Sequence, residues 1–204
     1  MRLFVLTRHA HSTLNVEGRV NGDPAVPVHI TEQGREEAAR VAHQLSEVAF
    51  GLCVHTRFMR TRETADVLLA GSDVPRLEEP LLDDIDVGEL EGETIEAYRA
   101  WKRGHPRSEP FPGGESLDDA GRRYARGLRG LLARPEEAIL VVCHEIAVRY
   151  ALNGAAGSSD LDGPEHAIPN ATPYLFDAAA LERAAGQIER LTRSGGREQE
   201  TRGE

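Results

Sequence analysis

The feature that most constrains this chain is an apolar run that ends abruptly in two basic side chains. Residues 3–7 read Leu-Phe-Val-Leu-Thr and are followed at once by Arg8 and His9. Such a run is typical of a buried strand, which would place Arg8 and His9 at its carboxyl end. In open α/β sheets ligands bind at that edge. The dipeptide by itself fits either an ordinary polar loop or an anion site, because guanidinium pairs with phosphate oxygens and imidazole attacks phosphorus.

A repeating order of strands and helices follows this first strand. We expect strands over residues 50–55, 138–143 and 172–176, with a further short strand at 187–191. We expect helices over residues 31–46, after Thr56-Arg57 through residues 60–68, and over 94–103, 116–132 and 146–152. We expect a loop at 15–28 and a loop with at most a short strand at 75–92. Strands that alternate with helices imply a parallel sheet covered on its faces. The predicted fold is a three-layer α/β/α domain with a mostly parallel central sheet and a small helical cap.

Composition limits the classes of partner. The 204 residues carry a net charge of −10, which argues against nucleic acid and against an anionic membrane surface. Any anionic ligand must therefore find a local positive pocket. Arg8 and His9 interrupt the first apolar run too early for a signal-like or membrane-length segment, so we expect a cytoplasmic protein. Cys53 and Cys143 lie inside predicted strands without zinc or redox spacing, which favours buried reduced thiols.

A second strand repeats the design of the first. The run 138–143 is the most apolar of the chain, and His144 follows it directly. Because parallel strands end at one edge of a sheet, we expect both histidines at the edge where ligands bind.

These residues belong to an ordered set that resembles the histidine phosphatase superfamily, the phosphoglycerate mutase-like proteins. The set comprises Leu6-Thr7-Arg8-His9-Ala10, Asn15, Gly18-Arg19, Thr31-Glu32-Gln33-Gly34, Thr56-Arg57-Phe58-Met59-Arg60-Thr61, Asp84 to Gly92, Gly113-Gly114-Glu115-Ser116, and Val141-Val142-Cys143-His144 with Arg149. It runs from about residue 3 to 176 in the family's order.

The resemblance implies a role for each matching residue. His9 would be the nucleophile that becomes phosphohistidine, with Arg8, Arg60 and His144 forming the phosphate pocket and Asn15 a further contact. Asp84 stands where the family usually has a glutamate that protonates the leaving oxygen. No metal or other cofactor is implied. The expected reaction is hydrolysis of a small-molecule phosphomonoester.

Three departures from the family pattern leave alternatives open. Ala10 and Glu145 replace glycines that usually follow the two histidines, and Asp84 is one methylene shorter than glutamate. Asp83, Asp86 and Glu89 are rivals for the role of the acid. The departures motivate a phosphate-binding or regulatory module as one alternative. A phosphoglycerate mutase is the other, although the segment between Asp84 and Ser116 is short for that activity.

The domain prediction is one unit over residues 1–193, with a cap at about 92–114 and a polar, disordered tail at 194–204. The cap contains the most basic stretch of the chain: Arg99, Lys102, Arg103, His105 and Arg107. This stretch either binds a second anionic group of the substrate or is a solvated helix face. A homodimer is possible, but no residue pattern specifies one.

Overall fold

The computed structural model describes residues 2–194 and has a five-stranded sheet in the order β3-β2-β4-β1-β5. Strands β1 (Leu3–Arg8), β2 (Leu52–His55), β3 (Arg76–Glu78) and β4 (Ala138–Cys143) are parallel, and β5 (Pro173–Asp177) is an antiparallel edge strand. The predicted mostly parallel α/β fold is confirmed. Pro173 begins the edge strand, where its missing N–H costs no ladder hydrogen bond.

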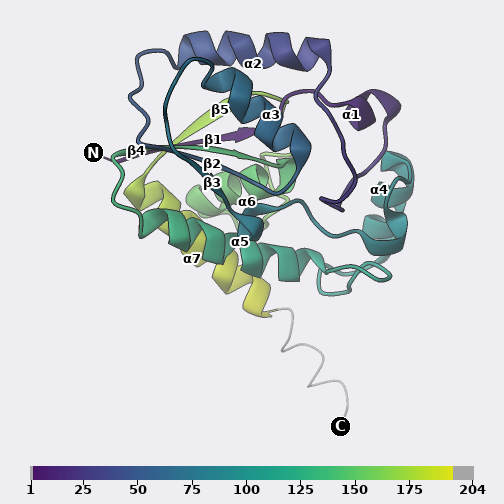
Figure 1. Cartoon of the computed structure of the whole chain (residues 1–204). Helices are drawn as coiled ribbons and strands as arrows, with labels where there is room; N and C mark the ends of the chain where they lie inside the picture. Colours follow the sequence, from purple (N-terminus) through teal and green to yellow (C-terminus); the bar gives the residue numbers. More distant parts are fainter. Residues whose placement is uncertain (1, 195–204) are drawn as a thin grey trace.

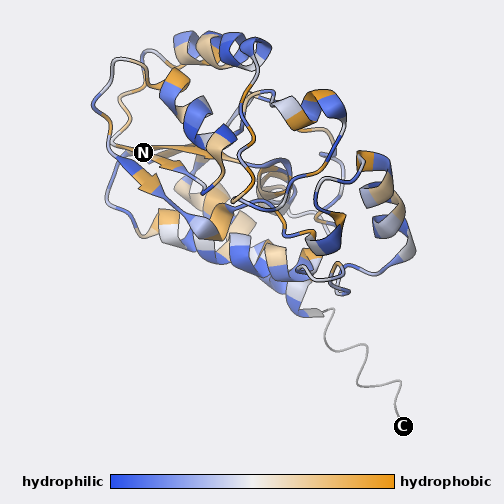
Figure 2. Ribbon diagram, turned by 45° about the vertical axis from the view of Figure 1, so that its right-hand side comes forward, coloured by the Kyte–Doolittle hydropathy of each residue, from blue (hydrophilic) through white to orange (hydrophobic). Residues whose placement is uncertain are grey.

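Helices cover both faces of the sheet (Figure 1). On one face lie α2 (Glu32–Gln44) and α3 (Met59–Leu68), and on the other lie α5 (Leu117–Leu132), α6 (Glu145–Ala155) and α7 (Ala178–Ser194). Each helical layer packs a separate apolar cluster against the sheet. The clusters are separate because alternate residues of β1 and β4 point to opposite faces. Figure 2 shows hydrophobic and hydrophilic residues mixed along these helices, as expected where one side packs and the other meets water.

Shorter elements surround the carboxyl ends of the strands. They are α1 (Thr13–Glu17), the 3₁₀ turns η1 (Pro80–Leu82) and η2 (Gly88–Leu90), and α4 (Ile95–Gly104). Figure 1 shows α1 and α4 beside each other at this end of the sheet. The helix α4 carries Arg99, Lys102 and Arg103 of the predicted cap, and His105 and Arg107 follow it. Cys53 and Cys143 are buried thiols without a disulfide, as predicted.

Two predictions about local structure are wrong. Residues 187–191 belong to α7 rather than to a strand, because Leu181, Ala184, Ala185 and Ile188 recur at helical spacing and are fully buried. The region 15–28 is not all loop, since Ser12 caps the short helix α1 through a capping box with Asn15. The predicted tail begins at residue 194. Its residues 195–204 lie outside the described part of the chain. Within residues 2–194, none of the helices combines the length and apolar composition that a membrane span requires.

Candidate active site

The two strand-end histidines meet because β1 and β4 are neighbours in parallel register. Arg8 lies opposite Cys143, so the next residues, His9 and His144, leave the sheet side by side. The His9 amide donates to the Cys143 carbonyl at 2.9 Å, and the two imidazole centroids are 5.5 Å apart. Arg60 enters from the first turn of α3, which follows β2 on the other side of β4. The predicted meeting of these four residues is therefore observed.

A pocket opens above this edge of the sheet. Its lining residues are Arg8, His9, Ser12, Leu14, Asn15, Arg19, Val20, Asn21, Val28, Arg60, Asp84, Ile85, Val87, Ile95, Tyr98, Arg99, Glu145, Ile146 and Arg149. Five of the six predicted site residues are among them. The sixth, His144, is fully buried and does not line the pocket. It contacts Arg60 and Asp84, which do.

The orientation of His9 leaves one ring nitrogen for chemistry. Its Nδ1 lies 2.9 Å from the Ala10 carbonyl oxygen, and since a carbonyl only accepts, Nδ1 carries the proton. The Nε2 atom of the neutral ring then has the lone pair. Burial lowers the pKa of His9 well below its ordinary value, and the charges of Arg60 and Arg8 lower it further. The imidazole is thus held neutral, as a nucleophile requires.

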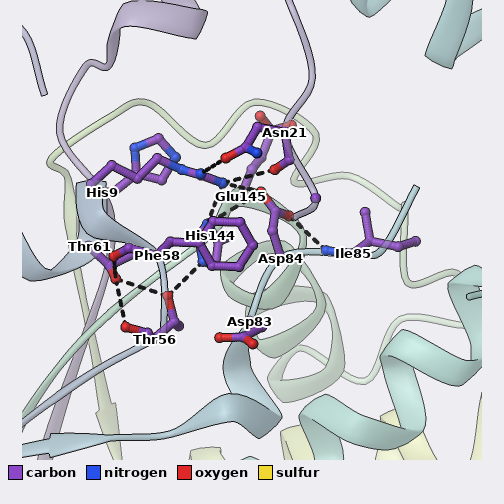
Figure 3. Close-up of polar contacts among 12 residues, drawn as sticks. His9, Asn21, Thr56, Phe58, Thr61, Asp83, Asp84, Ile85, His144 and Glu145 are labelled. Atoms are coloured by element: carbon purple, nitrogen blue, oxygen red, sulfur yellow. Dashed lines mark hydrogen bonds and ion pairs between the residues drawn. The ribbon is translucent and has the colours of Figure 1, made fainter. Parts of the chain in front are cut away.

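Arg60 is held by a residue that sequence reasoning missed. Its Nη1 donates a short hydrogen bond to Oδ1 of Asn21, and its Nη2 donates to the Asn21 carbonyl at 3.2 Å. Both residues are buried, and Figure 3 shows Asn21 across the site from His144. Because Asn21 and Arg60 are distant in the sequence, no local pattern signals the pair.

The turn that carries Asn21 is itself fixed by Glu91. The Glu91 carboxylate accepts from the Asn21 side chain at 2.7 Å and from the Gly22 amide at 2.6 Å. Gly22 packs so closely on the 85–87 backbone that a Cβ there would lie 2.2 Å from the Ile85 carbonyl oxygen. This clamp explains why glycine and glutamate occur at these positions.

Two threonines determine how the His144 ring is protonated. Thr61 Oγ1 donates to the Phe58 carbonyl at 2.8 Å, and Thr56 Oγ1 lies 2.9 Å from Thr61 Oγ1 and 2.9 Å from His144 Nε2. Because the Thr61 hydroxyl donates its proton to the Phe58 carbonyl, the Thr56 hydroxyl donates to Thr61 and accepts from His144 Nε2. Burial lowers the pKa of His144, which favours a neutral ring whose Nδ1 accepts from Arg60 Nη2 at 3.2 Å.

Asp84 faces the same two partners. Its Oδ2 lies 2.9 Å from Arg60 Nη2 and 3.3 Å from His144 Nδ1, and its Oδ1 accepts from the Ile85 amide, as Figure 3 shows. Burial alone would raise the pKa of Asp84, but the charge of Arg60, with which the carboxylate pairs, outweighs burial and holds the pKa well below its usual range. Asp84 is therefore a carboxylate in this arrangement.

The rival carboxylates occupy other positions. Asp83 is tied to Arg57 through Nε at 2.5 Å and through the backbone amide at 3.0 Å. Asp86 caps the Gly88 amide and is exposed, as is Glu89. None of the three lines the pocket. Among the four candidates for the acid, Asp84 alone faces the site.

Asn15 and Arg8 have partners within the protein as well. Asn15 Oδ1 accepts from the Ser12 amide at 3.1 Å and from Asn170 Nδ2 at 3.3 Å. Arg8 Nη1 lies 2.9 Å from Glu145 Oε2, so the glutamate that departs from the family pattern pairs with a pocket arginine. Ala10 is fully buried, and its amide donates to Thr64.

Most of the basic stretch of the cap is engaged elsewhere. Arg107 binds Asp118 and Asp162, and Lys102 lies 3.5 Å from Asp162. His105 contacts the Trp101 carbonyl. Of the five basic residues predicted to meet a second anion, only Arg99 lines the pocket. Among the described residues, no three His, Cys, Asp or Glu side chains are grouped so as to hold a metal ion.

Comparison with known proteins agrees with this geometry. The family model of the histidine phosphatase superfamily (branch 1) matches residues 4–195, and the chain belongs to this superfamily. A 2,3-bisphosphoglycerate-dependent phosphoglycerate mutase of Gloeobacter violaceus is 33% identical over 170 residues, covering 74% of each chain.

Other relatives carry different activities in their names. The human 6-phosphofructo-2-kinase/fructose-2,6-bisphosphatase 4 is 31% identical over 189 residues, which cover 86% of this chain and 38% of that protein. The fold matches the crystal structure of a putative alpha-ribazole-5'-P phosphatase from Escherichia coli with a TM-score of 0.75 and 22% identity, over 85% of this chain and 89% of that one. Phosphatases and mutases thus share this architecture.

Proposed function

We propose that this protein is a phosphatase that hydrolyses a small phosphomonoester through a phosphohistidine on His9, without a metal ion. The observation that carries the proposal is the state of His9. Its Nδ1 proton is held by the Ala10 carbonyl, and its lowered pKa leaves Nε2 unprotonated beside two arginines. Nucleophile and charge compensation are then both supplied by side chains.

In the first step, His9 Nε2 attacks phosphorus in line with the leaving oxygen. The N–P bond forms as the P–O bond to the alcohol breaks, and Arg8 and Arg60 compensate the charge on the non-bridging oxygens. Asp84 gives its proton to the departing alkoxide. A positioned acid of this kind accelerates such a step by roughly 10²–10⁴-fold.

Asp84 acquires that proton when substrate binds. A phosphoryl group beside Asp84 adds negative charge and competes for Arg60, and both effects raise the pKa of the carboxyl. The same negative charge raises the pKa of His144, whose protonated Nδ1 is then a further donor on the phosphate side. The proton comes from solvent or from the monoanionic form of the ester.

In the second step, water attacks the phosphohistidine. The Asp84 carboxylate takes the water proton, the P–O bond forms, and the N–P bond breaks to restore His9 and release inorganic phosphate. The two steps use one residue first as acid and then as base.

Phosphoglycerate mutase activity is the second candidate. The relative from Gloeobacter violaceus, 33% identical, favours it. A mutase must hold the phosphoryl group and pass it to a second hydroxyl instead of water. Protein that interconverts phosphoglycerates faster than it releases phosphate would establish this candidate in place of the phosphatase.

The proposal is tested by phosphate release from 4-nitrophenyl phosphate in excess chelator. We expect turnover in the wild type and loss of at least about 10³-fold in His9→Ala, because the nucleophile is gone. His43→Ala, an exposed position on α2, serves as the control and retains activity. Turnover that persists in His9→Ala would overturn the phosphohistidine route. No turnover in the wild type would support a phosphate-binding module instead.

A further inference from the structure

Glu145 is the one carboxylate besides Asp84 on the pocket lining, and it follows His144 as the first residue of α6. Its two oxygens contact two pocket arginines. Oε2 lies 2.9 Å from Arg8 Nη1, and Oε1 lies 3.4 Å from Arg149 Nη1. Figure 3 shows Glu145 beside the cluster of Asn21, Asp84 and His144. A negative charge is therefore built into the wall next to the proposed phosphate position.

This contact does not occupy the whole Arg8 guanidinium. Arg8 Nη1 is shared between Glu145 and the Ile168 carbonyl at 2.8 Å, whereas Arg8 Nε is buried without a hydrogen-bond partner. A buried donor without a partner is costly, so the Nε edge is the part of Arg8 that a phosphate oxygen would satisfy. Glu145 would then still contact Nη1 of Arg8 and lie beside the bound ester.

Arg149 is matched by carboxylates as well. Its Nη1 also donates to the His166 carbonyl at 3.1 Å, and its Nε lies 3.5 Å from Asp162 Oδ1. Asp162 in turn holds Arg107 and Lys102. Arg149 is thus flanked by two carboxylates, Glu145 and Asp162, which compensate its charge.

Two further arginines of the lining come from other elements than α6 and β1. Arg19 follows α1 and donates to the Gly92 carbonyl, and Arg99 belongs to α4; both are exposed. They can meet a charge at the far end of a long substrate. A charge on the carbon atoms nearest the ester oxygen instead meets Glu145, whose side chain is 37% exposed.

We propose that Glu145 selects phosphomonoesters whose alcohol is uncharged or cationic next to the ester oxygen and disfavours those with a carboxylate there. This inference rests on the proposed phosphatase function and narrows its substrate class. It also separates the site from phosphoglycerate chemistry, in which a carboxylate lies close to the phosphate.

The test uses three esters of nearly equal size: phosphoglycolate, ethylene glycol monophosphate and phosphoethanolamine. Each is measured as a competitive inhibitor of 4-nitrophenyl phosphate turnover, so that a slow substrate still reports its affinity. We expect phosphoglycolate to bind about fivefold more weakly than the glycol ester, and phosphoethanolamine at least as tightly. In Glu145→Gln the preference against phosphoglycolate disappears or reverses, since Arg8 and Arg149 lose their partner.

The ratio of inhibition constants separates charge selection from structural damage, because misfolding or a displaced Arg8 weakens all three esters together. Glu165→Gln removes an equal charge from an exposed position outside the lining and leaves the ratio unchanged. Equal inhibition by the three esters, absence of inhibition, or a ratio unaffected by Glu145→Gln would overturn the inference while 4-nitrophenyl phosphate turnover upholds the phosphatase. Absence of that turnover would instead overturn the proposed function.

Discussion

At the scale of single residues, Arg60 organises the site. One guanidinium serves Asn21, Asp84 and His144, so the proposed acid and the second histidine share the arginine that is proposed to bind phosphate. A phosphoryl group that takes hydrogen bonds from Arg60 releases Asp84 and His144 toward their protonated forms. Substrate binding and activation of the acid are therefore one event in this arrangement.

The Asp84→Asn variant distinguishes the contribution of the proposed acid from that of the nucleophile. An alkyl ester has a poor leaving group and needs the proton, whereas 4-nitrophenolate leaves without one. We expect kcat/KM to fall roughly 10²–10⁴-fold for the glycol monophosphate and much less for 4-nitrophenyl phosphate. Steady-state rates on both esters decide the matter. Equal losses on the two would mean that Asp84 positions Arg60 and does not donate the proton.

At the scale of elements, α4 joins the pocket to the body through stacked aromatic rings. Phe111 is buried, and the Trp101 and Tyr98 rings lie on it with centroids 4.1 Å and 5.5 Å away. Tyr98, Ile95 and Arg99 form one wall of the pocket. Phe111 therefore fixes the position of the helix that forms this wall of the pocket.

Phe111→Leu keeps most of the apolar volume and removes the stacking. We expect about 1 kcal/mol of lost stability and a KM raised about threefold, with kcat nearly unchanged, because the displaced wall contacts substrate remote from phosphorus. Phe176→Leu, in β5 and equally buried, is the matched control and should lose stability without the rise in KM. A KM that moves equally in both variants would contradict this role for α4.

At the scale of the whole molecule, a protein of net charge −10 gathers five arginines around one pocket: Arg8, Arg60, Arg149, Arg19 and Arg99. Eight other arginines of the described residues form ion pairs with carboxylates. The pocket histidines are buried in neutral form. Local placement, and not overall charge, thus determines what binds.

Burial of neutral histidines makes folding stability depend on pH. The pKa values of His9 and His144 are lowered in the folded chain, mainly by burial. Below the pKa of about 6.5 that a histidine has in the unfolded chain, the unfolded chain binds protons that the folded chain does not bind. This contribution to stability is therefore lost as the pH falls. Urea unfolding between pH 7.5 and 5.5 measures it.

We expect the difference in unfolding free energy between wild type and His9→Gln, or between wild type and His144→Gln, to shrink over this range. His43→Gln, which removes an exposed imidazole, should show no such trend. A constant difference for the two buried positions would contradict neutral burial.

The sequence by itself determined the type of sheet and the two strand ends that carry histidines, and the family resemblance added Arg60 to them. Apolar runs that end in Arg8-His9 and in His144 fix which ends of the strands carry chemistry, and parallel pairing then brings them together. The order of the motifs indicated the family, which the match over residues 4–195 confirms. The misread segment at 187–191 also carried a usable signal, since its apolar residues have helical spacing.

The tertiary structure alone decided which side chains of the site contact one another. Asn21 with Arg60, Glu145 with Arg8, and the place of His144 behind the lining all join residues far apart in the chain. Hydrophobic periodicity reports which face of an element is buried, but it contains no information on which loop crosses another. Those contacts depend on how loops fold over a sheet edge, and a one-dimensional pattern does not encode that geometry.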